Sequence, residues 1–84
     1  MIYDLIIENK VEKHLLTLDK SIVNRIIDAV DKLKTDPKPH NCIKLQVLDG
    51  YRIKVGKYRI LYSINEPEKI ITIYKVSKRD DAYK

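Results

Sequence analysis

The segment Tyr51-Arg-Ile-Lys-Val-Gly-Lys-Tyr-Arg-Ile-Leu-Tyr62 decides the fold of this chain. Apolar and polar residues alternate on either side of the Gly56-Lys57 pair. This alternation is typical of a β-hairpin with a two-residue turn, in which glycine takes a position that needs positive φ. The sequence therefore predicts that Val55 pairs with Tyr58 across the turn.

The same register gathers positive charge on one face of the hairpin. Lys54 would lie directly opposite Arg59, and Arg52 opposite Leu61. Residues two apart share a face, so the three cations project together. Like charges directly opposite each other destabilise a sheet, and no Asp or Glu occurs between residues 51 and 64. We expect this face to hold a phosphate; a solvated sheet surface is the alternative.

Length and composition indicate a small globular protein. The chain has 84 residues, 44% of them hydrophobic and 35% charged, which predicts one domain over residues 1–84. The single cysteine, Cys42, excludes an intramolecular disulfide and fits a reducing compartment. No secretory signal or membrane-length apolar run is visible, so we expect a cytoplasmic protein without a membrane partner.

The net charge of +5 is unevenly placed along the chain. Residues 1–40 carry seven Lys and Arg against seven Asp and Glu, whereas residues 41–84 carry ten against five. This asymmetry favours a polyanion-binding half on a neutral scaffold.

The segments before the hairpin predict one strand and two helices. Residues 1–7 are apolar and β-rich. Asn9 with Glu12 resembles a capping box and opens a helix of about ten residues. Asp19 or Ser21 then caps a second helix with an apolar stripe at helical spacing, which Pro37 and Pro39 end.

Strands dominate the remainder of the chain. Strands are predicted over residues 42–47, 51–55, 58–64 and 69–76, with turns at 48–50 and 65–68. The order β-α-α-β-β-β-β predicts an α+β fold, with two N-terminal helices packed on one face of a largely antiparallel four- to five-stranded sheet. Ile53, Val55, Ile60 and Tyr62 would face the helices, leaving the cations on the open face.

Metal and cofactor sites find little support in the sequence. His14 and His40 lie far apart and belong to no ligand-spaced cluster. We expect His14 to be a surface or core-edge residue and Cys42 to be buried as a small hydrophobe. With two glycines and no phosphate-loop motif, we expect no metal and no cofactor.

A site rich in Lys, Arg and Tyr suits RNA cleavage by internal attack. The 2′-OH nucleophile belongs to the substrate, so the protein must orient it, move protons and stabilise the phosphorane. Lys78-Arg79 follows the last predicted strand, and Tyr83 lies four residues further on. Arginine binds phosphate in a bidentate manner, and tyrosine can stack on an unpaired base.

The hairpin, with Leu45 and Asp49-Gly50 before it, resembles the signature L…G..YRIRVG.YRI.Y of RelE-type toxins of the RelE/ParE superfamily. The ending from Val76 to Tyr83 is similar to that family's V.HR.D.Y ending. The resemblance implies a toxin of a type II toxin–antitoxin pair. It also implies a metal-independent endoribonuclease that cleaves mRNA in the ribosomal A site, leaving a 2′,3′-cyclic phosphate (or 3′-phosphate) and a 5′-hydroxyl.

The resemblance also implies roles for single residues. Lys54 matches the proposed general base, Arg59 the arginine that stabilises the transition state, Arg79 the general acid or leaving-group stabiliser, and Tyr83 the tyrosine that stacks on the substrate. We assign phosphate contact to Arg52. The further candidates for RNA contact are Lys44, Lys57 and Lys78.

Two residues of the ending depart from the family pattern. Lys78 stands where many relatives carry His, and Asp80 replaces a frequent basic residue. The implied partners are a RelB-like antitoxin and the ribosome, with its 16S rRNA and A-site mRNA. Two other interpretations stay open: a ParE-like inhibitor of DNA gyrase, and a non-catalytic RNA- or protein-binding relative.

Overall fold

A computed structural model describes residues 2–45 and 50–78 of the chain. Its elements follow in the order β1 (Asp4–Ile7), α1 (Asn9–Leu15), α2 (Lys20–Lys32), β2 (Ile43–Lys44), β3 (Gly50–Val55), β4 (Tyr58–Asn65) and β5 (Ile70–Lys78). The predicted order of one strand, two helices and four further strands is confirmed.

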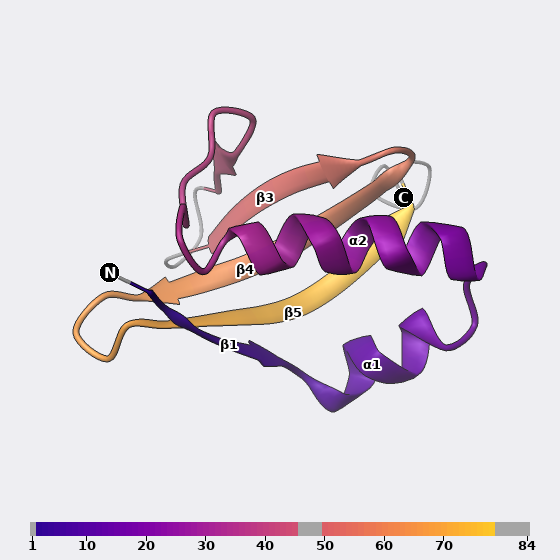
Figure 1. Cartoon of the computed structure of the whole chain (residues 1–84), viewed down its shortest axis with the longest axis horizontal. Coiled ribbons are helices and arrows are strands. Elements are labelled where there is room, and N and C mark those ends of the chain that lie inside the picture. The colour runs from indigo at the N-terminus through magenta and orange to yellow at the C-terminus, as the bar shows by residue number, and fades with distance from the viewer. Residues whose placement is uncertain (1, 46–49, 79–84) are drawn as a thin grey trace.

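The strands form one sheet in the order β1-β5-β4-β3-β2. β1 runs parallel to β5, and every other neighbouring pair is antiparallel. α2 crosses one face of this sheet, and α1 packs against β5 (Figure 1). The predicted α+β fold with two N-terminal helices and a largely antiparallel sheet is confirmed.

The hairpin register is the predicted one. Val55 pairs with Tyr58, and Lys54 with Arg59, across a turn in which Gly56 has a φ of 59°. A side chain at this φ is disfavoured, which explains the glycine.

β1 covers only part of the outer edge of β5. Its four residues pair with Ile70–Ile73, and the chain then turns into α1. α1 packs against β5 in place of a further strand. The last turn of α1 is thereby brought close to the C-terminal half of β5.

The helices bury one face each, because their apolar residues recur at helical spacing. Asp19 is the N-cap of α2, as predicted, although its side chain makes no capping hydrogen bond. The predicted capping box on Asn9 is wrong: Glu8 is the N-cap of α1, and Asn9 already lies in the first turn. The core joins sheet residues Ile53, Tyr58, Ile60, Tyr62, Ile64, Ile71, Ile73 and Val76 to helix-side residues Val11, Leu15, Ile26, Val30 and Leu33.

Tyr62 ties the loop after α2 to the sheet. Its side chain is fully buried, and its hydroxyl donates a hydrogen bond of 2.7 Å to the carbonyl oxygen of Pro37. Burial raises the pKa of the Tyr62 phenol above its usual value of 10.0. The Tyr62 ring stacks on that of Tyr51, with 5.8 Å between centroids, and the Lys38 Nζ lies 5.5 Å from the Tyr51 centroid.

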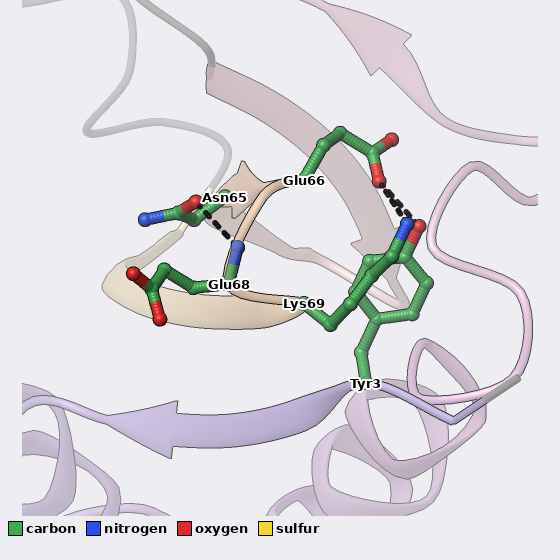
Figure 2. A network of polar contacts seen from close by, with 5 residues as sticks. All are labelled: Tyr3, Asn65, Glu66, Glu68 and Lys69. Carbon is green, nitrogen blue, oxygen red and sulfur yellow. Dashed lines mark hydrogen bonds and ion pairs between the residues drawn. The ribbon is translucent and has the colours of Figure 1, made fainter.

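The turn between β4 and β5 is held to the start of the chain by polar contacts (Figure 2). The Tyr3 hydroxyl donates a hydrogen bond of 2.5 Å to Glu66 Oε1, and Lys69 Nζ lies 3.3 Å from the same oxygen. The Lys69 Nζ also lies 5.2 Å from the centroid of the Tyr3 ring. Asn65 Oδ1 accepts a hydrogen bond from the backbone N–H of Glu68. These contacts stabilise the turn next to β1.

Several element boundaries differ from the sequence prediction. β1 begins at Asp4, whereas the strand was predicted from residue 1, and α2 ends at Lys32, well before Pro37. β3 begins one residue earlier than predicted and β4 ends one residue later. The strand predicted over residues 42–47 is reduced to Ile43–Lys44, and residues 46 and 47 lie outside the described part of the chain. The first helix ends at Leu15, after seven residues rather than about ten. The last strand continues two residues beyond Val76 to Lys78, because Tyr58 and Arg59 pair with Lys78 and Ser77.

Candidate anion-binding site on the open face of the sheet

A first row of side chains crosses three strands on the face opposite α2. Lys54 of β3 lies opposite Arg59 of β4, which in turn lies opposite Ser77 of β5. Their neighbours along the strands, such as Ile60, are buried in the core. Because successive residues of a strand point to opposite faces, this row belongs to the open face.

A second row runs parallel to the first, two residues further along each strand. Arg52 of β3 lies opposite Leu61 of β4, which lies opposite Lys75 of β5. The apolar side chain of Leu61 thus separates two cations. This spacing reduces the repulsion that directly opposed like charges would cause.

The two rows border a hollow of about 430 Å³, which we call the arginine hollow. Its volume lies in the range of small-ligand sites, roughly 300–1,000 Å³. No Asp or Glu of the described residues lines it. Its lining consists of His14, Leu45, Arg52, Arg59, Leu61, Lys75, Val76 and Ser77.

Arg52 is half-buried in this hollow, and its Nε is enclosed without a hydrogen-bond partner among residues 2–45 and 50–78. The residue nevertheless lines the hollow, so its guanidinium group can donate hydrogen bonds to an acceptor placed there. The geometry suits an anion with several oxygens, such as a phosphate group.

Lys54 lies at the margin of this arrangement. Its side chain is exposed, and it borders a neighbouring hollow on the β3 side that includes Lys32, Asp36 and Asn41. It therefore lies next to Arg59 in the first row but does not line the arginine hollow.

The other cations proposed for RNA contact lie elsewhere. Lys57 and Lys78 border a second hollow of about 500 Å³ at the hairpin end of α2, together with Arg25 and Asp19. Lys44 is exposed and pairs with Tyr51, so it lies on the helix side of the sheet rather than beside Arg52. The set predicted from sequence is thus divided between the two faces.

Arg79 and Tyr83, whose roles are implied by the resemblance, lie outside the described residues. Their roles stay predictions. Within residues 2–45 and 50–78, no three His, Cys, Asp or Glu side chains gather closely enough to hold a metal ion. Cys42 is partly buried against the core.

His14 has no functional role among the residues predicted from the sequence. Its side chain is exposed on α1, as predicted, yet it lines the arginine hollow together with Arg52 and Arg59. No local pattern could have revealed this, because the contact depends on α1 packing beside β5. The one available signal was that His14 lies three residues after Val11, which places it at the edge of the buried face of α1.

Solved structures with a similar fold come from toxin–antitoxin systems. The chain is 35% identical to a chain of the archaeal RelE–RelB complex from Pyrococcus horikoshii, with a TM-score of 0.86 over 94% of this chain and 97% of that one. A mutant of the Escherichia coli toxin RelE in the free state, with two arginines replaced by alanine, gives a TM-score of 0.82 at 21% identity, over 99% and 90% of the two chains. The fold is therefore that of RelE toxins.

Sequence comparisons agree with the structural ones. The model of a family described as "ParE toxin of type II toxin-antitoxin system, parDE" matches residues 5–83. A Methanocaldococcus jannaschii protein named "Putative toxin RelE1" is 33% identical over 100% of this chain and 98% of its own length. The chain belongs to the RelE/ParE family of toxins from type II toxin–antitoxin systems. None of the described helices is long and apolar enough to cross a membrane.

Proposed function

We propose that this RelE-like toxin is an endoribonuclease that cleaves mRNA on the ribosome by attack of a substrate 2′-OH on the adjacent phosphodiester. The observation that carries the proposal is the arginine hollow, which Arg52 of β3, Arg59 of β4 and Lys75 of β5 line together. Guanidinium groups fit phosphate oxygens in pairs and stay charged at any working pH. They can therefore stabilise the charge that builds on a pentavalent phosphorane.

The two rows suggest separate catalytic roles for Arg59, Lys54 and Arg52. Arg59 lies at the centre of the first row, which suits contact with the scissile phosphate. Lys54, directly beside it on β3, would take the proton of the 2′-OH. Arg52 would bind a phosphate oxygen through its guanidinium group in the arginine hollow. From the resemblance, Arg79 would stabilise the departing oxygen and Tyr83 would stack on the substrate base.

The proposed partners follow from the charge and from the relatives. The related RelE chain from Pyrococcus horikoshii was solved as a complex with RelB. We infer a RelB-like antitoxin for this toxin, with an acidic segment for the open face and apolar residues for exposed side chains such as Leu16, which is 86% exposed. The ribosome would supply 16S rRNA phosphates for Lys57, Lys78 and Lys44. Residues 1–84 would act as one toxin domain in the cytoplasm.

A second candidate function is inhibition of DNA gyrase. It is favoured by the description of the matching family, which names ParE toxins. A gyrase inhibitor needs no phosphate-cleaving arrangement, so the arginine hollow would be incidental to it. A non-catalytic relative is a third possibility, in which no substitution in the hollow would alter cell growth.

Controlled expression in a bacterial host separates these functions. Primer extension on a translated transcript should show new 5′ ends within codons soon after induction, and these ends should vanish when the start codon is removed. Plasmid supercoiling, measured in the same cells, should stay normal. Altered supercoiling without new transcript ends would refute the nuclease and support gyrase inhibition.

Purified ribosomes programmed with a short mRNA give the sharper test. Arg59→Ala should lower the single-turnover cleavage rate roughly 10²- to 10³-fold, the usual cost of removing one transition-state donor. Lys20→Ala is the matched control, because Lys20 is an exposed cation at the start of α2, on the other side of the sheet. Equal rates for Arg59→Ala and the parent protein would refute the assignment.

A further inference from the structure

The proposed reaction needs a proton donor for its leaving group, and His14 is the candidate. In cleavage by internal attack, the 2′-oxygen forms a bond to phosphorus and the bond from phosphorus to the 5′-oxygen breaks. The 2′-OH releases one proton to a base, and the departing 5′-oxygen needs one from an acid. Arginine is a poor source for it, because a guanidinium group keeps its proton in proteins.

His14 is well placed on the side where an acid is needed. Nucleophile and leaving group lie on opposite sides of phosphorus in an in-line displacement. In the first row, Lys54 lies on the β3 side of Arg59, and Ser77 lies on the β5 side. His14 lines the arginine hollow from α1, which packs against β5. A phosphate held by Arg59 would thus have Lys54 on one side and His14 on the other.

The chemistry of the lining residues points the same way. Three cations line the arginine hollow together with His14: Arg52 from β3, Arg59 from β4 and Lys75 from β5. Lys10 of its own helix and Tyr74 of β5 border a smaller hollow that His14 also lines. Of the side-chain types lining the arginine hollow, imidazole is the one that ordinarily gives and takes a proton near neutral pH.

We propose that His14 is a further catalytic residue of the arginine hollow and donates the proton to the departing 5′-oxygen. This inference rests on the proposed ribonuclease function. The imidazolium gives up one proton as the bond from phosphorus to the 5′-oxygen breaks. The 2′-OH proton goes to the uncharged amine of Lys54, so the step leaves a cyclic phosphate and a 5′-hydroxyl. The imidazole then regains a proton from solvent, and the Lys54 ammonium formed in the step returns one to solvent.

A substrate with a better leaving group tests this role directly. The probe is a short mRNA in which sulfur replaces the 5′-oxygen at the cleaved bond, because a thiolate departs without being protonated. With ribosomes and the oxygen substrate, His14→Gln should cleave roughly 10²-fold or more slowly than the parent. With the sulfur substrate, His14→Gln should match the parent within a few-fold. Arg59→Ala should be slow with both substrates.

His40→Gln is the matched control, since His40 is the other histidine and lies exposed in the loop after α2. It should match the parent on both substrates. Thermal melts should show that His14→Gln folds normally, because the side chain is exposed.

Three results would overturn the inference. If His14→Gln cleaves the oxygen substrate at the parent rate, His14 has no part in the reaction. If His14→Gln is equally slow on both substrates, His14 binds RNA but donates no proton. In both cases Arg59→Ala would still report the nuclease itself. Absence of cleavage by the parent protein would instead refute the proposed function, and this inference with it.

Discussion

The hydroxyl group of Tyr62 gives a quantitative test of how the loop after α2 is held. In Tyr62→Phe, the ring remains, but the 2.7 Å hydrogen bond to Pro37 is lost. A typical hydrogen bond contributes about 1 kcal/mol net, and a partly buried acceptor left without its donor adds a further cost. We expect the free energy of unfolding to fall by about 1–2 kcal/mol. In a domain of this size, that lowers Tm by roughly 4–16 °C.

Tyr3→Phe is the matched control for this substitution. It removes another tyrosine hydroxyl, whose hydrogen bond to Glu66 is shorter at 2.5 Å but exposed to solvent. Water can replace an exposed partner, so we expect almost no change in Tm. Urea titrations followed by circular dichroism should agree, with a lower midpoint and an unchanged m value for Tyr62→Phe. A larger loss of stability in Tyr3→Phe than in Tyr62→Phe would refute the reasoning.

Three further predictions concern the hairpin turn and two titrating groups. Gly56→Ala should lower the free energy of unfolding by about 1–2 kcal/mol in urea titrations, because residue 56 has a φ of 59°. Hydrogen bonds from Tyr3 and Lys69 lower the pKa of Glu66, so the stability from this contact is present above the ordinary pKa of 4.5 and is lost as pH falls through the lowered pKa. A carboxyl NMR titration of Glu66 checks this direction. In Tyr3→Phe the pKa of Glu66 should move upward. Because the pKa of Tyr62 is raised, its contribution to stability is fully present below pH 10 and is lost at higher pH. Ultraviolet titration of the parent and of Tyr62→Phe should assign one late-ionising phenol to Tyr62, which ionises only on unfolding. An early titration of that phenol would contradict the burial argument.

The hairpin could be predicted in detail because its determinants are local. Alternating apolar residues and one glycine fix which side chains share a face, and the pairing of Lys54 with Arg59 followed directly. The apolar stripe of α2 was equally informative, since helical spacing alone identifies Ile26 and Val30 as buried residues.

The features that sequence reasoning missed depend on tertiary packing. His14 lines the arginine hollow because β1 stops after pairing with Ile73 and α1 packs against β5. Lys44 faces away from Arg52 because the short β2 places it opposite Tyr51. The number of positive charges in the C-terminal half does not show which face of the sheet each cation occupies.

The prediction of a capping box at Asn9 was wrong for a different reason. Asn9 and Glu12 have suitable identities and spacing, but the chain already enters the helix at Asn9. The strand–helix junction is set by the pairing of β1 with β5, which ends one residue before Glu8. A capping motif predicts the approximate position of a helix start, and the pairing of neighbouring strands determines the residue at which the helix begins.

The glycines at the two ends of β3 have a consequence for how this toxin can diversify. The chain has two glycines, and they bracket the strand: Gly50 begins it and Gly56 follows its last residue. Inserting or deleting one residue between them would turn Ile53 outward and drive Arg52 or Lys54 into the apolar interior. Substitutions can exchange one cation for another over evolutionary time, but a change of length here would abolish folding before it altered specificity.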